Sequence, residues 1–244
     1  MVPGTRFEIP LRRIFWVLMA CTLALVVLDA VPVLLRRLAG IELPPSIESR
    51  VQLNGEANIP TWFSTVLLFS VAATSLANHW LGAEPAGRNV VRRLFWLAFG
   101  IVFVYVSLDE AARFHELIDS ESQYRLKWVF FYAPFAGIFL AACTYYLLWL
   151  RKDSPELTRW ILGGLATYLA GGLLAEFVAY SLAMAGQLTS EALHVEMTLE
   201  ETLEMSGTIL LWMGCLHEFQ SRLNRFLARR AFALPMPGGK PQMD

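Results

Sequence analysis

Six apolar runs, each about as long as a membrane-spanning helix, constrain this chain more than any other feature of its sequence. A helix needs about 20 predominantly apolar residues to cross a hydrocarbon core roughly 30 Å thick. Runs of this kind occupy residues 13–35, 60–82, 94–117, 128–150, 159–186 and 193–220. The sequence therefore predicts an all-α polytopic membrane protein, built as a bundle of six transmembrane helices.

The composition agrees with a membrane protein. Of the 244 residues, 56% are hydrophobic and only 17% are charged, whereas about a quarter are charged in soluble domains. The expected partner is the lipid bilayer, and the net charge of −1 gives no basis for a nucleic-acid partner. We expect residues 1–230 to form the six-helix domain and residues 231–244 to be a disordered cytoplasmic tail.

The basic residues orient the predicted helices. If the N-terminus is cytoplasmic, 14 Lys and Arg residues lie in cytoplasmic segments and five lie on the opposite side. Positively charged residues concentrate on the cytoplasmic side of membrane proteins. Both termini are therefore predicted to be cytoplasmic, and a bacterial inner membrane is the expected location. The first apolar run is too long for a signal peptide and is expected to remain as a span.

Several smaller features have structural interpretations. The 38–59 segment is expected to hold a short interfacial helix, and the three single cysteines are expected to act as small hydrophobic residues. Gly163, Thr167, Gly171 and Ala175 recur every four residues, which predicts close packing with another helix. Polar residues at the cytoplasmic helix ends are expected to be interfacial: His79, His217 and Glu218.

Four predicted helices carry a carboxylate at a similar depth. Each lies 16–18 residues from an arginine that marks the cytoplasmic end of its helix, and the four are Asp29, Asp109, Glu176 and Glu204. At a rise of 1.5 Å per residue, they lie about 24–27 Å from that boundary. Intramembrane acids are costly and usually face a bundle interior or a water-filled cavity. Asp29 lies three residues before Pro32, so a role in a helix kink is an alternative for it.

Two acidic motifs extend this layer. Asp109, Glu110, Arg113, His115 and Glu116 follow the third apolar run, within S-x-D-E-x4-H-E. On the sixth helix, E-E-x-x-E-x-x-G contains Glu200, Glu201 and Glu204, and its final residue, Gly207, would let another backbone approach. Carboxylates on facing helices can hold Zn, Mn or iron together with a histidine. We therefore predict a divalent metal held by His115, Glu116, Glu200 and Glu204.

The same acidic motifs supply candidate acid/base residues, and some of their members also have simpler structural interpretations. Glu110 or Glu176 is the predicted general acid/base, and the neighbouring polar residues are Asp29, Asp109, Arg113 and Glu201. An ion pair within one helix would equally explain Asp109, Arg113 and Glu116. A solvated helix end would equally explain Glu200 and Glu201.

The two motifs resemble a pattern found in uncharacterised bacterial polytopic membrane proteins. A more distant similarity links the chain to the alkaline-ceramidase-like membrane hydrolases, which join Ser, Asp and His residues from several helices around zinc. That resemblance implies hydrolysis of a lipid-like substrate. The His-x-x-x-His pair of those enzymes has no counterpart here, because His194 and His217 are 23 residues apart.

Three functions are compatible with the sequence. The first is a metal-dependent membrane enzyme that acts on a lipid-like substrate near the outer leaflet. The second is a proton- or cation-coupled transporter or channel. The third is a non-catalytic structural component, in which the acids fix helix register or bind a partner such as a second copy of the chain.

Overall fold

The computed structural model describes residues 7–55, 57–82, 88–114, 127–150, 154–187 and 189–233, and these residues form helices without any strand. The helices follow one another along the chain as α1 (Leu11–Ala39), α2 (Pro45–Val51), α3 (Ile59–Leu81), α4 (Arg88–Ala112), α6 (Lys127–Leu150), α7 (Pro155–Leu169), the π-helical segment η1 (Ala170–Ala175), α8 (Glu176–Met184) and α9 (Ser190–Ala233). The predicted all-α class is confirmed.

Five helical stretches are long and apolar enough to cross a membrane. They are Leu11–Ala39, Ile59–Leu81, Val90–Ala112, Phe131–Leu150 and Pro155–Met184. These stretches support a multi-pass membrane protein and coincide with the first five predicted spans. The sixth predicted span lies within the more polar α9, so its crossing of the membrane stays a prediction, as does the cytoplasmic location of the termini.

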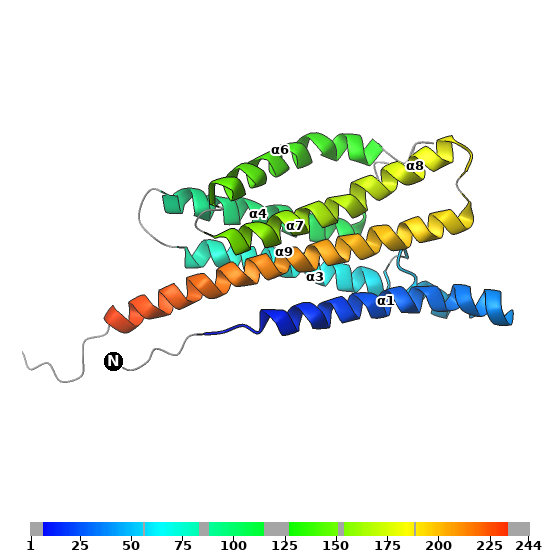
Figure 1. Ribbon diagram of the computed structural model, residues 1–244, viewed down its shortest axis with the longest axis horizontal. Coiled ribbons are helices and arrows are strands. Elements are labelled where there is room, and N and C mark those ends of the chain that lie inside the picture. Colours follow the sequence, from blue (N-terminus) through cyan, green and yellow to red (C-terminus); the bar gives the residue numbers. More distant parts are fainter. Residues whose placement is uncertain are drawn as a thin grey trace, which may run out of the picture.

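The helices run along one long axis, and α9 extends along the whole bundle (Figure 1). With 44 residues, α9 is about 66 Å long. It contacts α1, α3, α7, α8 and η1. A helix surrounded by so many neighbours can keep polar residues away from lipid, which explains how α9 fits into an otherwise apolar bundle.

The two ends of the bundle differ in their contacts. At one end, hereafter the terminal end, the Phe7 N–H donates to Asn224 Oδ1 over 2.9 Å and the Ile9 N–H donates to Gln220 Oε1 over 2.7 Å. At the opposite end, hereafter the acidic end, Arg37 of α1 pairs with Glu191 of α9. The start of α1 and the end of α9 therefore lie together, as Figure 1 shows.

Local sequence signals set several helix boundaries. Gly40 ends α1 with a φ of 66°, a left-handed conformation that glycine adopts without steric cost. Asn58 caps α3 by accepting from the Thr61 N–H over 3.0 Å. Pro60 and Pro155 stand in the first turns of α3 and α7, where the missing N–H needs no partner. The 38–59 segment contains the short helix α2, as predicted.

The third predicted span ends earlier than expected. Ala112 is the last residue of α4, and Arg113 has a φ of 60°, which a right-handed helix cannot accommodate. The prediction that this helix continues without a break to residue 117 is wrong, because the helix is interrupted at Arg113. Residues 115–117 lie outside the described residues.

Two hydrophobic clusters form the core. The larger joins α3, α4, α6, α7 and α9 through residues such as Trp96, Phe99, Leu147, Ile161 and Leu211. The smaller joins α1, α3, α9 and the segment after α2, and its buried members are Leu25, Leu53, Leu67, Met205 and Ile209.

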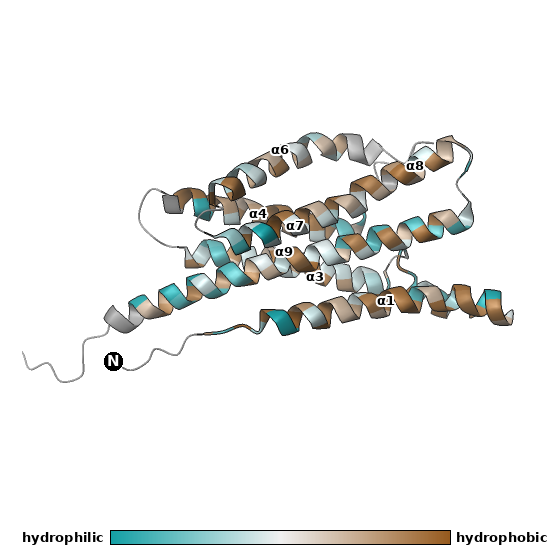
Figure 2. Ribbon diagram, viewed as in Figure 1, coloured by the Kyte–Doolittle hydropathy of each residue, from teal (hydrophilic) through white to brown (hydrophobic). Residues whose placement is uncertain are grey.

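Large apolar side chains also cover the outside of the bundle. Leu23, Phe69, Ile101, Ile138 and Phe177 are all exposed. Figure 2 shows hydrophobic colour over much of the outer helices and hydrophilic turns along α9. Apolar side chains on the outer surface are suited to contact with lipid.

Glycines let α9 approach α7 and η1 closely. A Cβ on Gly164 would lie 2.7 Å from the Leu211 Cγ, and a Cβ on Gly207 would collide with the Tyr168 backbone. A Cβ on Gly171 would lie 2.7 Å from the Glu200 carbonyl oxygen. The predicted close packing is therefore confirmed at Gly171 and Gly207. It is wrong at Gly163, where an added Cβ would meet no atom of another described segment within 4 Å, because Gly164 instead faces α9.

Candidate functional site

A buried aspartate connects α1, α9 and the segment after α2. The Asp29 Oδ1 accepts a hydrogen bond of 3.0 Å from the Leu53 N–H, and its Oδ2 accepts one of 3.0 Å from the Thr198 hydroxyl. The His194 Nε2 lies 3.4 Å from the same Oδ2. This bonding makes Asp29 an organising residue rather than only a partner for the backbone near Pro32.

The carboxylates of two further helices approach Asp29. Glu201 of α9 is partly buried and interacts electrostatically with Glu110 of α4 and with Asp29 of α1. The three acids belong to helices that are separate in sequence, and Glu110 and Asp29 lie within range for their charges to act on Glu201. We refer to Asp29, Glu110, His194 and Glu201 as the acidic cluster.

Tyr168 links the acidic cluster to the remaining acids. Its side chain is partly buried and interacts electrostatically with Glu204, Glu110, Glu201 and Asp109. A phenol can donate a hydrogen bond to a carboxylate and can also accept one. Tyr168 therefore supplies α7 with a polar group beside acids from α4 and α9.

The π-helical segment makes room for Glu204. A Cβ on Gly171 would lie 2.9 Å from the Glu204 Cγ, and a Cβ on Gly172 would collide with the Glu204 Oε1. Glycine is required at position 171, where a Cβ would also lie 2.7 Å from the Glu200 carbonyl oxygen, whereas at position 172 the Glu204 side chain would have to shift. Short π-helical segments frequently occur at functional sites, and this one places two glycines directly against an acid of α9.

The structure describes only some of the remaining predicted site residues. His115 and Glu116 lie outside the described residues, and only the backbone of Glu176 is described, at the start of α8. Glu200 is partly buried on α9, and Asp109 is partly buried near the end of α4. Among the described residues, no three His, Cys, Asp or Glu side chains are grouped as metal ligands.

His194, Thr198 and Tyr168 have positions that the sequence did not predict. His194 and Thr198 are one turn apart on α9, so they face the same side. That spacing is visible in the sequence, but their partner Asp29 is more than 160 residues away. Only the packing of α1 against α9 brings these groups together.

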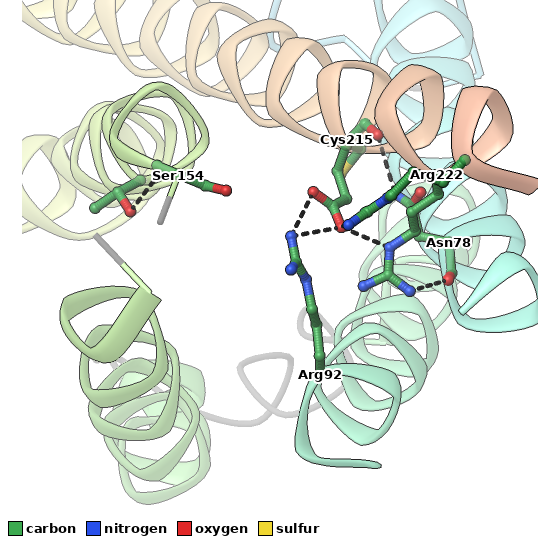
Figure 3. Close-up of polar contacts among 8 residues, drawn as sticks. Asn78, Arg92, Ser154, Cys215 and Arg222 are labelled. Carbon is green, nitrogen blue, oxygen red and sulfur yellow. Dashed lines mark hydrogen bonds and ion pairs between the residues drawn. The ribbon is translucent and has the colours of Figure 1, made fainter. Parts of the chain in front are cut away.

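A second polar cluster lies at the terminal end, where Glu218 binds Arg92 and Arg222. Figure 3 labels these two arginines together with Asn78, the fourth member of the cluster. Glu218 is 2% exposed and accepts from Arg92 Nη2 over 2.9 Å and from Arg222 Nε over 2.5 Å. Arg222 Nη1 also donates to the Asn78 carbonyl oxygen over 2.7 Å. We refer to these four residues as the buried ion-pair cluster.

Glu218 is therefore buried among helices rather than exposed at a helix end, and its predicted interfacial depth stays a prediction. Its helix α9 continues beyond the predicted span to Ala233, and neighbouring helices cover this turn. His217, the preceding residue, is partly exposed and its Nε2 lies 3.3 Å from Glu156 Oε2. Adjacent residues on one helix point about 100° apart, which explains their different surroundings.

Comparison with known protein families finds a match that covers most of the chain. Residues 13–219 match the family described as "Domain of unknown function (DUF8692)". The chain belongs to this family. No curated protein matches the chain, and no solved structure matches it.

The matched region contains the complete acidic cluster. It runs from the start of α1 to Phe219 on α9, so it also includes Glu218 of the buried ion-pair cluster. Membership agrees with the predicted resemblance to an uncharacterised membrane family. It stays a prediction that the two acidic motifs are signatures of the family. The similarity to alkaline-ceramidase-like hydrolases also stays a prediction.

Proposed function

We propose that this protein is a metal-dependent membrane enzyme that acts on a lipid-like substrate at the acidic end. The observation that carries the proposal is the charge interaction of Glu201 on α9 with Glu110 on α4 and Asp29 on α1. Buried like charges disfavour one another unless a cation or a proton compensates them. A divalent cation provides this compensation and, when bound, would acidify a water molecule for attack on a substrate.

The described residues supply part of a ligand set. Glu110, Glu201 and Glu204 offer the carboxylate oxygens that Zn, Mn and iron accept. They do not form a complete set by themselves. The predicted ligands His115 and Glu116 would complete it from the segment that follows α4, together with Glu200.

Asp29 and His194 provide the acid/base part of the proposal. A carboxylate beside one imidazole nitrogen orients the ring and stabilises its protonated form. His194 is partly exposed and its Nε2 faces the buried Asp29, so in this scheme its Nδ1 would be the nitrogen that exchanges a proton with a water molecule or a substrate. Asp29 is a positioning residue in this scheme, and His194 joins the predicted Glu110 and Glu176 as an acid/base candidate.

The apolar surroundings favour a lipid-like substrate. Exposed Leu28, Leu34 and Val195 lie on α1 and α9 close to Asp29 and His194 in sequence. A substrate with an acyl or isoprenoid chain could remain in the bilayer while its polar part reaches the acids. This arrangement agrees with the position near one membrane surface that the depth estimate predicts.

Metal analysis of the purified full-length protein tests this proposal. We expect about one Zn, Mn or Fe per chain, and a loss of at least tenfold in metal affinity for Glu201→Gln and Glu204→Gln. Glu42→Gln is the matched control, because Glu42 is exposed. Wild-type protein without stoichiometric metal, or metal content unchanged in both variants, would contradict the proposal.

Activity measurements then examine the acid/base residues. His194→Ala and Asp29→Asn should reduce hydrolysis of a responsive lipid by about 100-fold or more while retaining the metal. A panel of ceramides, phospholipids and isoprenoid phosphates would identify that lipid by mass spectrometry. Loss of metal in both variants would instead make them part of the ligand framework.

Proton- or cation-coupled transport is the second candidate, because the same three acids could exchange a proton. The larger hydrophobic cluster argues against it, since buried rings and aliphatic side chains fill the bundle between the two polar clusters. Proteoliposome flux that disappears in Glu201→Gln would favour transport. Flux equal to protein-free liposomes would favour the enzyme.

A further inference from the structure

The buried ion-pair cluster is bordered by hydrogen-bond donors that have no acceptor among the residues that the structure describes. The buried atoms without a hydrogen-bond partner include Arg222 Nη2, Arg92 Nε, Trp96 Nε1 and the Tyr146 hydroxyl. Arg222 is 4% exposed, Trp96 is 0% and Tyr146 is 4%. Leaving a buried donor unsatisfied destabilises the folded state, so four in one region call for an explanation.

The four donors come from three helices that meet at one place. Trp96 lies one turn after Arg92 on α4, so the two side chains share a face. Tyr146 of α6 stacks on Phe95 of α4 with ring centroids 3.9 Å apart. The Tyr146 hydroxyl lies within range of the charges on Arg92, Glu218 and Arg222, and its stacking on Phe95 holds it next to the helix that carries Arg92.

The local charge shows what kind of ligand fits. Among the described residues, Arg92 and Arg222 form ion pairs with one carboxylate, Glu218, so two positive charges share one negative charge. Arg225 Nη2 lies 3.9 Å from Glu218 Oε1 and adds another positive charge at the edge. Figure 3 shows Arg92 and Arg222 extending from opposite sides toward the same carboxylate. A water molecule could accept hydrogen bonds here, but it would leave the excess charge in place.

We propose that Arg92, Trp96, Tyr146 and Arg222 form a binding site for an oxyanion of the phosphate class at the terminal end of the bundle. A phosphate group accepts several hydrogen bonds and carries the missing negative charge. The phosphate of an anionic lipid and free inorganic phosphate share this chemistry. The site is separate from the acidic cluster and does not depend on the proposed enzymatic function.

A ligand-binding experiment on the full chain in phosphate-free maltoside micelles tests the site. The probes are inorganic phosphate, phosphatidic acid and diacylglycerol, which has the same chains as phosphatidic acid without the phosphate. Sodium chloride of equal ionic strength is the control for free phosphate. A ligand in hundredfold excess over its Kd should raise the Tm by roughly 5–10 °C.

The pattern of response identifies the source of the phosphate group. A response to phosphatidic acid but not to free phosphate or diacylglycerol assigns a lipid phosphate to the site. A response to both phosphate-containing probes shows that free phosphate is sufficient. Equal responses to phosphatidic acid and diacylglycerol, or no response to either phosphate-containing probe, would overturn the proposal.

Two conservative variants connect the response to these side chains. Tyr146→Phe and Trp96→Phe each remove one unpartnered donor and retain an aromatic ring, so each should weaken the Kd about tenfold or more. The matched controls are Tyr145→Phe and Trp80→Phe, because both of these side chains are exposed. Their Kd should match that of the wild type.

The unliganded variants provide an independent measurement. Without phosphate, Tyr146→Phe should be as stable as the wild type or slightly more stable, because it removes a buried hydroxyl that has no partner. If one variant does not fold, as judged by circular dichroism and gel filtration, the other still tests the site. Unchanged affinity in every folded variant would refute the assignment.

Discussion

At the scale of single residues, Glu218 shows how a charge is kept inside the bundle. It is almost completely buried, and both carboxylate oxygens have arginine partners. Arg222 in turn donates to the Asn78 carbonyl, and the Asn78 amide donates to the Cys215 carbonyl over 2.9 Å. The network therefore connects α3, α4 and α9 at the terminal end.

Replacing this carboxylate should destabilise the protein strongly. Glu218→Gln leaves Arg92 and Arg222 buried without their counter-charge, which is expected to cost about 3–5 kcal/mol. Thermal unfolding in detergent, followed by the exposure of buried thiols such as Cys143 and Cys215, would measure the loss as a lower Tm.

Glu156→Gln is the control for that measurement. Glu156 is exposed and pairs with His217 across 3.3 Å, and exposed ion pairs contribute about 0–1 kcal/mol. A Glu218→Gln variant that unfolds at the same temperature as Glu156→Gln would show that the buried network is not required for stability.

At the acidic end, Asp29 is likewise a buried carboxylate that is held by polar partners. Its two oxygens bind a backbone amide and a hydroxyl from different segments, and His194 lies beside it. Partners of this kind stabilise a carboxylate that would otherwise be costly to bury. Each polar cluster is thus organised around an acid that joins α9 to other helices.

At the scale of helices, small residues determine how closely α7 and α9 pack. Gly164 faces Leu211 of α9, whereas a Cβ added at the preceding Gly163 would meet no atom of another described segment within 4 Å. The two glycines are adjacent in the sequence and occupy the same helix. They therefore form a matched pair for testing the contact.

Adding one methyl group at each position should have opposite effects. Gly164→Ala would place its Cβ 2.8 Å from the Leu211 backbone nitrogen, and such overpacking costs about 1–3 kcal/mol. Gly163→Ala should be neutral or stabilise by up to about 1 kcal/mol, because alanine favours the helix. Thermal unfolding of both variants under identical conditions checks this, and equal Tm values would contradict the observed contact.

At the scale of the whole molecule, the bundle brings the start of α1 and the end of α9 to the same end. Five stretches satisfy the length and composition of membrane spans, and α9 runs beside them through the bundle. If α9 also crosses, the number of spans is even. The predicted topology, with both termini cytoplasmic, then follows from the asymmetry of Lys and Arg.

Reporter fusions would test that topology. A fluorescent protein fused after Ala233 should be bright, and alkaline phosphatase fused there should be inactive, because both report a cytoplasmic position in bacteria. Phosphatase inserted after Glu42, between α1 and α2, should be active. Active phosphatase after Ala233 would contradict an even number of spans with a cytoplasmic N-terminus.

The sequence by itself determined the helical class, the first five spans and the presence of acids near one end. Each of these depends on local properties: the length of an apolar run, the 1.5 Å rise per residue and the identity of single residues. The break at Arg113 could not be predicted in this way, because the residues around it continue an acceptable helical pattern.

Only the tertiary structure decided which polar groups meet. Asp29 contacts His194 and Thr198, and Glu218 contacts Arg92, across separations of more than 100 residues. A helical wheel gives the face of each helix but not the neighbour that the face meets. The packing of α1, α3 and α4 around α9 supplied that information, because burial in a shared interior makes each charged group depend on a partner from another helix.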